Sequence, residues 1–417
     1  MNAASPTPRL PLQQVLICGA LIVTLSMGIR HGFGLWLQPV TMERGWTRET
    51  FAFAMAVQNL TWGVAGLFAG MLADRLGAYR VIVGCSLMYA LGLVLMALSP
   101  TPWLFLGSAG VMIGIAQAGT TYAVIYGVLG RNVDASRRAW AMGVAAAAGS
   151  FGQFLMVPVE NTLINGSVSF GVPGLGWQGA LFVLAAMALV IVPLASGLRE
   201  RWLESGLVKP QQTIAAALRE AFTYPSFQLL MAGYFVCGFQ VVFIGVHLPS
   251  YLKDKGLTPD VATAALALIG LFNVFGTYIA GTLGPRFARK HILATIYAAR
   301  SVAIVVFLLV PLTPWSVYVF ASVMGFLWLS TVPPTNAVIA QIFGVQYLSM
   351  LGGFVFLSHQ IGSFMGVWLG GRLFDMTGSY DVVWWLAVAL GVFAALINLP
   401  VREQAIARPA PASGAAA

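Results

Sequence analysis

Charged residues are what this sequence has least of. Only 8% of its 417 residues are Asp, Glu, Lys or Arg, whereas soluble domains carry about 25%. Apolar side chains make up 59% of the chain, and the mean hydropathy is +0.84. This composition excludes an ordinary soluble domain and predicts an integral membrane protein.

Cysteine is also scarce, with three residues in the chain. Cys18, Cys85 and Cys237 lie far apart inside apolar runs without CxxC spacing, so we interpret them as small buried side chains and expect neither a disulfide nor a metal site. The sequence contains no phosphate-binding loop, metal-ligand cluster or nucleophile motif. We therefore expect no cofactor, no ATP-driven step and no enzymatic activity.

Acidic residues number 13 against 22 Lys and Arg, which gives a net charge of +9. The basic residues lie in short segments between apolar runs and form no patch with interleaved aromatic residues. This pattern argues against a nucleic-acid partner.

Long apolar runs are what the sequence has in abundance, and each is close to the roughly 20 residues that cross a bilayer. They predict an all-α fold of twelve transmembrane helices at 13–38, 49–72, 80–98, 103–129, 139–159, 177–197, 227–250, 260–283, 291–310, 314–340, 350–371 and 381–400. We divide the chain into an N-terminal six-helix half (1–197), a cytoplasmic linker (198–226), a C-terminal six-helix half (227–400) and a disordered cytoplasmic tail (401–417). Within the linker, 213–222 is expected to form a short amphipathic helix on the membrane surface.

The distribution of positive charge predicts the orientation. With the N-terminus inside, fifteen Lys and Arg residues fall in cytoplasmic segments, five fall outside, and two lie within spans. This positive-inside bias places both termini in the cytoplasm.

An internal repeat supports the two halves. GMLADRLGAYR at 70–80 aligns with GTLGPRFARKH at 281–291, an offset of 211 residues, and the same offset aligns the Gly-x-Thr at 45–47 with that at 256–258. Halves with an even number of spans have the same orientation, an arrangement in which the substrate lies between them near the bilayer midplane.

GMLADRLGAYR resembles the signature between the second and third helices of the major facilitator superfamily. The resemblance implies that Asp74, Arg75 and Arg80 act in gating, with Asp74 near a helix N-terminus and the two arginines holding acceptors. HLPSYLKDKGLTPD at 247–260 and SHQIGSFMGVWLGGRLFDMTGSYD at 358–381 resemble bacterial members of the monocarboxylate porter group, which implies a bacterial inner membrane location. The animal transporters of that group carry an Asp/Arg pair on the eighth helix, where this chain has Asn273 and no ionisable residue.

The run 20–40 carries Arg30 and His31 in an apolar span, where a cation costs roughly 2.5–3.5 kcal/mol and marks a functional site by default. Gly28 and Gly32 form a GxxxG ridge for a neighbouring helix, with Arg30 on the opposite face. All thirteen acids, including Glu160, fall in loops or at the ends of the predicted spans. No intramembrane carboxylate is thus expected to neutralise Arg30 or Arg300, and a guanidinium is well matched by a planar anion.

Each candidate has a functional and a structural interpretation. Arg30 is interpreted as the carboxylate-binding residue, with a bond to backbone carbonyls or a Gln as the alternative. Arg300 is interpreted as structural or gating, and His359 as a substrate donor or the group that titrates. His31 is more often a packing residue, and His247 is either part of the outer gate or interfacial. The remaining candidates are polar residues: Gln117, Tyr122 and Tyr126 on the fourth span, which the resemblance implies lines the cavity, and Gln153 and Asn336 on the fifth and tenth spans, for which a helix-helix bond is the preferred interpretation.

These residues predict a secondary transporter of a small organic anion, with a monocarboxylate as the favoured cargo, and we expect a monomer. Arg30 binds the carboxylate, His359 and Tyr122 complete the pocket, and the energy comes from proton symport or from anion exchange. The first alternative is an exporter of lipophilic compounds in which Arg30 is structural. A non-transporting sensor of the same fold is the second alternative, disfavoured because the sequence shows no large extra soluble domain.

Overall fold

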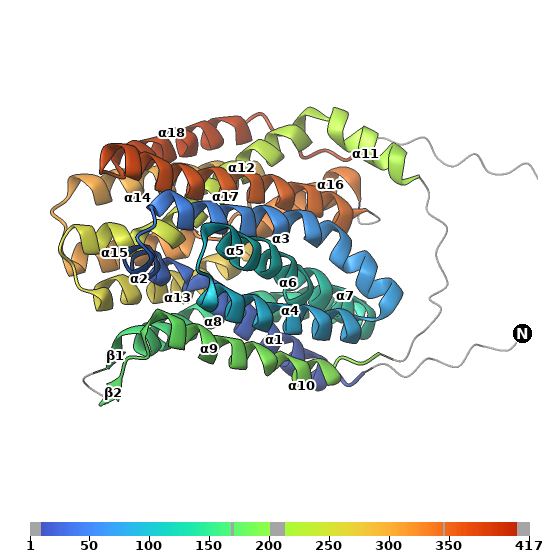
Figure 1. The fold of residues 1–417 in the computed structure, drawn as a ribbon. Coiled ribbons are helices and arrows are strands. Elements are labelled where there is room, and N and C mark those ends of the chain that lie inside the picture. Colours follow the sequence, from blue (N-terminus) through green and yellow to red (C-terminus); the bar gives the residue numbers. More distant parts are fainter. Residues whose placement is uncertain (1–9, 168–170, 201–212, 345–346, 407–417) are drawn as a thin grey trace, which may run out of the picture.

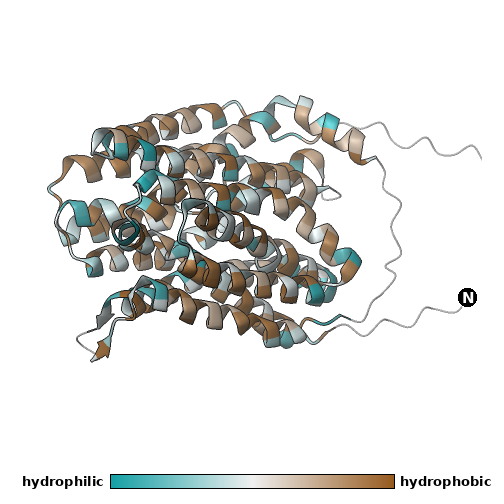
Figure 2. Ribbon diagram, viewed as in Figure 1, coloured by the Kyte–Doolittle hydropathy of each residue, from teal (hydrophilic) through white to brown (hydrophobic). Residues whose placement is uncertain are grey.

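The computed structural model describes residues 10–167, 171–200, 213–344 and 347–406. Its helices form an elongated bundle with apolar residues along the flanks and hydrophilic residues gathered toward the two ends (Figures 1 and 2). Twelve helical segments in the described part of the chain are long and apolar enough to cross a membrane. The predicted all-α membrane fold is confirmed.

The first half supplies six of these segments. Its elements are α1 (Leu12–His31), η1 (Phe33–Trp36), α2 (Leu37–Arg44), α3 (Arg48–Leu76), α4 (Ala78–Leu98), α5 (Pro102–Phe105), the π-helix η2 (Leu106–Met112), α6 (Ile113–Thr120), α7 (Tyr122–Asn132), α8 (Ala135–Asn165), α9 (Gly176–Leu189) and α10 (Ile191–Ser196). Between α8 and α9, β1 (Gly166–Ser167) pairs antiparallel with β2 (Val172–Pro173).

The second half supplies the other six segments. Its elements are α12 (Pro225–Asp254), α13 (Pro259–Leu283), α14 (Arg289–Leu309), α15 (Pro314–Leu327), α16 (Val332–Phe343), α17 (Leu348–Thr377) and α18 (Asp381–Asn398). Before them comes α11 (Ile214–Thr223), where the sequence predicted a short helix in the linker. It begins because the Thr213 hydroxyl accepts from the amide of Ala216.

Besides the sixth span, which is interrupted at Val190 between α9 and α10, three spans that the sequence analysis treated as continuous are interrupted. The first span breaks after His31, the fourth at Thr121, and the tenth between α15 and α16. Adding the repeat offset of 211 to Thr121 gives Val332, one residue after Thr331, which precedes α16, so the breaks in the fourth and tenth spans correspond to within one residue. This correspondence supports the duplication that the sequence predicted.

The helix pair α1 and α8 packs through small residues. A Cβ at Gly28 would overlap Met156, one at Gly32 would overlap Glu160, and one at Gly152 would overlap the Thr24 carbonyl. The predicted glycine ridge is therefore confirmed, because it lets α8 approach α1 closely.

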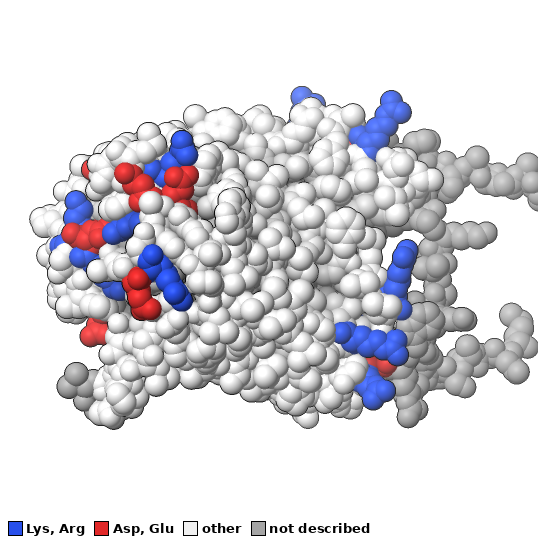
Figure 3. Space-filling model, viewed as in Figure 1, with Lys and Arg blue, Asp and Glu red and all other residues white. Residues whose placement is uncertain are grey.

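The two halves are bonded to each other at one end of the bundle, which we call the closed end. There Arg48 of α3 binds the carboxylate of Asp254 at 2.6 Å and donates to the Tyr380 hydroxyl at 2.9 Å. Glu49 accepts from Arg372 and Trp368, and Asp375 accepts from the Arg48 and Glu49 amides. Figure 3 shows the resulting mixture of acidic and basic residues at the left end of the molecule.

At the opposite end, near α7 and α11 in Figure 1, three ion pairs between described residues do not cross between the transmembrane halves. Arg131 binds Asp74 and Glu200 in the first half, and Arg289 binds Glu403 in the second. The chain after α18 belongs to this end. Val401 is fully buried and the Ile406 amide donates to the Ile342 carbonyl at 3.1 Å, so the predicted disorder does not hold for 401–406. The rest of the predicted tail lies outside the described residues.

Candidate functional site

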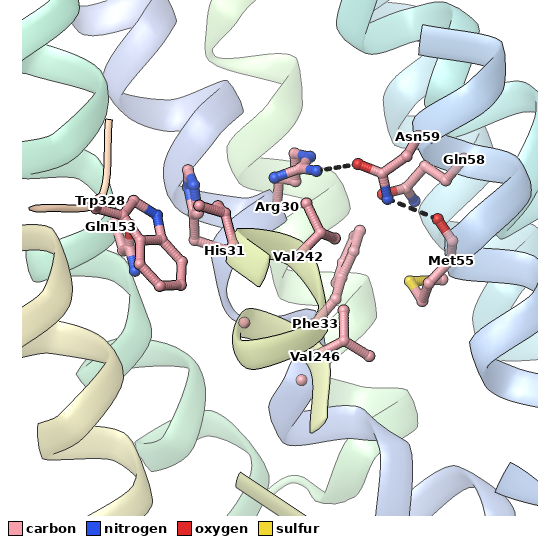
Figure 4. Close-up of a pocket in the computed structure, with 13 residues that line it drawn as sticks. Arg30, His31, Phe33, Met55, Gln58, Asn59, Gln153, Val242, Val246 and Trp328 are labelled. Atoms are coloured by element: carbon pink, nitrogen blue, oxygen red, sulfur yellow. Dashed lines mark hydrogen bonds between the residues drawn. The ribbon is translucent and has the colours of Figure 1, made fainter. Parts of the chain in front are cut away.

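A small cavity of about 40 Å³ lies between the two halves and is lined by both (Figure 4). The first half contributes residues from α1, η1, α3 and α8, and the second contributes one side of α12 and Trp328, at the break after α15. The lining is mainly apolar, with a few polar groups: Arg30, His31, Gln58, Asn59 and Gln153. Such a lining is typical of a pocket for a small molecule.

Arg30 lies in the last turn of α1, where free carbonyls at a helix C-terminus favour a cation. One guanidinium nitrogen donates to the Asn59 side chain, and the guanidinium carbon lies 4.7 Å from the centre of the Trp62 ring. Its Nε is buried without a partner, and no ion pair joins Arg30 to an acid among the described residues. The positive charge is thus positioned at the cavity but not neutralised.

His31 lies next to Arg30 and also lines the cavity. Its Nδ1 donates to the Met27 carbonyl at 2.6 Å, and Figure 4 places its ring on the side of Gln153 and Trp328. Gln153 bridges the halves by donating to the Leu266 carbonyl at 3.0 Å, the helix-helix bond that the sequence analysis preferred for it. His31 is anchored by its own helix and keeps Nε2 available to the cavity.

His359 does not line this cavity, but a chain of rings connects it to Arg30. Trp62, which stacks beneath Arg30, lies 5.2 Å from the Phe356 ring, and Phe356 stacks on His359 at 5.9 Å. The Tyr234 ring also packs against His359, with the two ring centres 5.2 Å apart. The Nδ1 of His359 is 3.0 Å from the Gln360 side-chain oxygen. Trp62 belongs to the first half and Phe356 to the second. Their rings lie between Arg30 and His359.

Tyr122, Tyr126 and Gln117 are likewise absent from the cavity lining. The Tyr122 hydroxyl occupies the space beside Gly149 of α8, and its ring lies 5.5 Å from that of Tyr126. Gln117 is fully buried inside the first half. The structure therefore brings together Arg30, His31 and Gln153, and leaves the predicted tyrosines and Gln117 beside the cavity.

The sequence analysis expected neither Arg30 nor Arg300 to have a carboxylate partner, but the hydrogen bonds of Arg300 differ from those of Arg30. It is fully buried and donates to the Leu327 carbonyl at 2.7 and 3.1 Å and to the Trp328 carbonyl. These are carbonyls that the break after α15 leaves without helical partners. Arg300 thus holds together an interrupted helix.

Two further polar residues, Asn273 and Asn336, differ in their surroundings. Asn273 donates to the Ser150 hydroxyl at 2.8 Å and accepts from the Leu329 amide at 3.0 Å, which ties α13 to α8 and to the break in the tenth span. Asn336 is exposed and its side-chain oxygen lies beside Gly352.

His247 lies beneath the ion pairs of the closed end. Its Nε2 donates to the Val367 carbonyl at 2.8 Å, and its Nδ1 is 3.2 Å from the Tyr380 hydroxyl, which also accepts from Arg48. This position is consistent with the predicted role at the outer gate, because Arg48 belongs to the other half.

Asp74, Arg75 and Arg80, which the resemblance assigns to gating, lie at the end of the bundle opposite the closed end. Asp74 pairs with Arg131 at the end of α7, at 2.6 Å, where the resemblance implied contact with a helix N-terminus. Within the described chain, Arg75 and Arg80 form no hydrogen bond or ion pair with a side chain or carbonyl, so the acceptors expected for them are not engaged. Their role in gating stays a prediction.

Glu160 requires a correction. The sequence analysis placed it just beyond the end of a span, but α8 continues to Asn165 and the Glu160 side chain is fully buried. The expectation that all thirteen acids lie in loops or at the ends of spans therefore fails for Glu160, which is buried five residues before the end of α8. Glu160 is nevertheless not the partner of Arg30, because both of its oxygens are buried without a hydrogen-bond partner.

Sequence reasoning missed the residues that position Arg30. Gln58 and Asn59 are adjacent polar residues in the middle of the second span, and Trp62 follows one helical turn after Gln58. A polar pair inside an apolar run was a usable signal. That Asn59 faces Arg30 depends on how α3 packs against α1.

The family model of the Major Facilitator Superfamily matches residues 16–350. The MFS-type transporter YcxA of Bacillus subtilis is 22% identical over 89% of this chain and 90% of its own, and monocarboxylate transporter 13 of Rattus norvegicus is 26% identical over 90% and 86%.

Solved structures give the same fold. A bacterial homolog of the human lysosomal transporter Spinster, in an inward-facing and unoccupied conformation, superposes with a TM-score of 0.71 at 16% identity, covering 96% of this chain and 99% of that one. Its inward-facing and occupied form gives a TM-score of 0.72 over 93% and 96%.

Proposed function

The chain belongs to the major facilitator superfamily, and we propose that it is a secondary active transporter of a small organic anion, with a monocarboxylate as the favoured cargo. The observation that carries this proposal is Arg30, a permanent cation at a cavity between the halves, held by Asn59 and Trp62 but without an acid partner among the described residues. A carboxylate fits a guanidinium with two parallel hydrogen bonds. Relatives named as monocarboxylate transporters agree with this choice.

Alternating access of the two halves is the proposed mechanism, as the family membership favours. With both termini in the cytoplasm of a bacterial inner membrane, the closed end faces outward and the cavity belongs to an inward-facing state. The outward side is held by Arg48 with Asp254 and by Glu49 with Arg372, all between halves. We propose a monomer, since each polypeptide contains both halves of the site. The energy comes from protons or from an exchanged anion.

Uptake of labelled lactate by proteoliposomes tests the proposal. Arg30→Ala removes hydrogen bonds to a charged group, worth about 1.5–3 kcal/mol, so uptake at low lactate should fall roughly 10- to 100-fold. Arg30→Lys should recover only part of it, because an ammonium cannot form the planar pair.

The matched control is Arg44→Ala. Arg44 also lies over a tryptophan ring, that of Trp177 at 5.4 Å, but it does not line the cavity. This variant should transport as the wild type does. Lactate uptake that is equal in the wild type and Arg30→Ala would remove Arg30 from the site.

The apolar lining favours one other candidate, an exporter of lipophilic compounds. Phe33, Met55, Val242, Val246 and Trp328 surround the cavity and can hold a neutral aromatic molecule. Cells that express the protein distinguish the two: an exporter changes drug sensitivity and leaves growth on carboxylates unchanged, whereas the anion transporter does the reverse.

A further inference from the structure

Glu160 is the most costly side chain in the described structure that the proposed site does not use. It is fully buried in α8, and neither carboxyl oxygen has a hydrogen-bond partner. An ionised carboxylate without partners costs several kcal/mol in an apolar interior, whereas the neutral acid costs far less. In this conformation the side chain is stable only with a proton on it.

The position of Glu160 connects it to the cavity. It follows Gln153, a cavity residue, by seven positions, which places it on the same side of α8 about 10 Å nearer the closed end. Its carboxyl group fills the space above Gly32, the residue that ends α1 directly after Arg30 and His31. Only glycine leaves room for this carboxyl, so the α1 break and Glu160 form one packed unit.

The titratable groups on the surrounding helices are engaged elsewhere. On α1, Arg30 binds Asn59 and His31 binds the Met27 carbonyl. On α13, Asp260 accepts from Asn161 at 3.2 Å. Glu43 of α2 accepts from the Trp177 indole of α9 at 2.6 Å. Tyr89 of α4 lies within electrostatic range of both Glu160 and Arg30, and its hydroxyl donates to the Ser26 carbonyl.

We propose that Glu160 is a proton-binding site of this transporter. It is protonated while the two halves are in contact at the closed end, and it is deprotonated when they separate there. The step is simple: the O–H bond of the carboxylic acid breaks, the proton passes to water, and the carboxylate becomes hydrated. In this conformation Gly34, just after α1, lies so close to α12 that a Cβ there would overlap the Gly245 carbonyl. Opening of the closed end separates α1 from α12. Water then reaches α8 beside Gly32. The inference rests on the proposed transport function, because it couples that transport to protons.

Infrared spectroscopy of the wild-type protein in lipid tests the proton directly and needs no substrate. A protonated acid without hydrogen bonds gives a carbonyl-stretch band apart from those of ionised carboxylates and amides. The band should be present at pH 7, shift when glutamate is isotopically labelled, and disappear in Glu160→Gln. The control Glu43→Gln, which removes a carboxyl group bound to Trp177, should retain it.

Transport of labelled lactate tests the coupling. Glu160→Gln should exchange internal for external lactate as the wild type does, but should lose lactate accumulation driven by an imposed pH gradient. Glu160→Asp, which keeps the acid, should regain part of that accumulation and keeps the test available if the Gln variant does not fold.

The outcomes separate the two proposals. An absent band in the wild type, a band that persists in Glu160→Gln, or undiminished pH-driven accumulation by that variant would each overturn the role of Glu160. Failure of the wild type to move any carboxylate would instead count against the proposed function, and the infrared result would still decide whether Glu160 holds a proton.

Discussion

Arg300, Arg30 and Glu160 are ionisable residues inside the bundle, and their surroundings compensate the free-energy cost of burial to different degrees. Arg300 is satisfied by main-chain oxygens, Arg30 is held by Asn59 and Trp62 at a cavity, and Glu160 has no partner at all. Only the second arrangement leaves a positive charge accessible to a ligand, and only the third requires a proton. A residue's type therefore says little about its role until its partners are known.

Gly152 provides a prediction at this scale. A Cβ there would overlap the backbone of Thr24, whereas one at Gly143 on the same helix would meet nothing within 4 Å. Gly152→Ala should push α8 away from α1 and destabilise the protein by about 1–3 kcal/mol. Gly143→Ala should be neutral or slightly stabilising, since alanine favours a helix.

Thermal unfolding of the purified variants in detergent checks this difference. The melting temperature of Gly152→Ala should fall by several degrees and that of Gly143→Ala should not. Equal melting temperatures would mean that the close approach of α1 and α8 contributes nothing to stability.

The candidate site was only partly predictable from the sequence. Arg30 and His31 could be found because a charge in an apolar run is rare and costly. Tyr122 and Gln117 lie outside the cavity lining in this conformation, and helical spacing could not show this, because it gives the face of a residue but not the neighbour which that face meets. Glu160 was missed because the end of a span is uncertain by a few residues, and here those residues decide whether a carboxylate is inside or outside.

At the scale of elements, the number of spans was predictable and their interruptions were not. Twelve apolar runs produced twelve spans because length and hydropathy are local properties. The breaks after His31, at Thr121 and between α15 and α16 lie in stretches where glycine, threonine or proline lowers helix propensity. Such residues are common in transmembrane helices that remain continuous, so their presence alone predicts no break.

Interrupted helices matter because their ends carry partial charges at membrane depth. The end of α1 carries Arg30, and the end of α15 directs its free carbonyls at Arg300. One break thus positions Arg30, the proposed ligand-binding cation, and the other supplies carbonyls that satisfy Arg300.

At the scale of the whole molecule, the two ends of the bundle differ in how the halves are joined. The closed end carries ion pairs between halves, and the end near the termini carries pairs within each half. Rocking of the halves must break the first set and leaves the second intact. The ion pairs between halves therefore stabilise one conformation of the transport cycle.

Asp254→Asn should shift that equilibrium. It removes the partner of Arg48, a partly exposed pair whose loss is worth about 1 kcal/mol, so the closed population should fall roughly fivefold relative to the open one. Spin labels at Met42 and Met376, both exposed and in different halves, report the distance across the closed end after replacement by cysteine in a background without the native cysteines.

The wild type should give one short distance, and Asp254→Asn should add a longer one. Glu200→Gln, which breaks a pair within the first half at the opposite end, is the matched control and should leave the distribution unchanged. An unchanged distribution in Asp254→Asn would show that this ion pair does not hold the halves together.

The account depends most on Arg30 meeting a negative charge brought by the cargo, and ligand binding to purified protein tests this most directly. The melting temperature should be measured across a panel of mono-, di- and tricarboxylates for the wild type, Arg30→Ala and Arg44→Ala. A monocarboxylate at 100 times its wild-type Kd should stabilise the wild type and Arg44→Ala by about 2.7 kcal/mol, and Arg30→Ala, which binds roughly 10- to 100-fold more weakly, by only about 0.4–1.4 kcal/mol. Equal stabilisation of Arg30→Ala and the wild type would contradict the account.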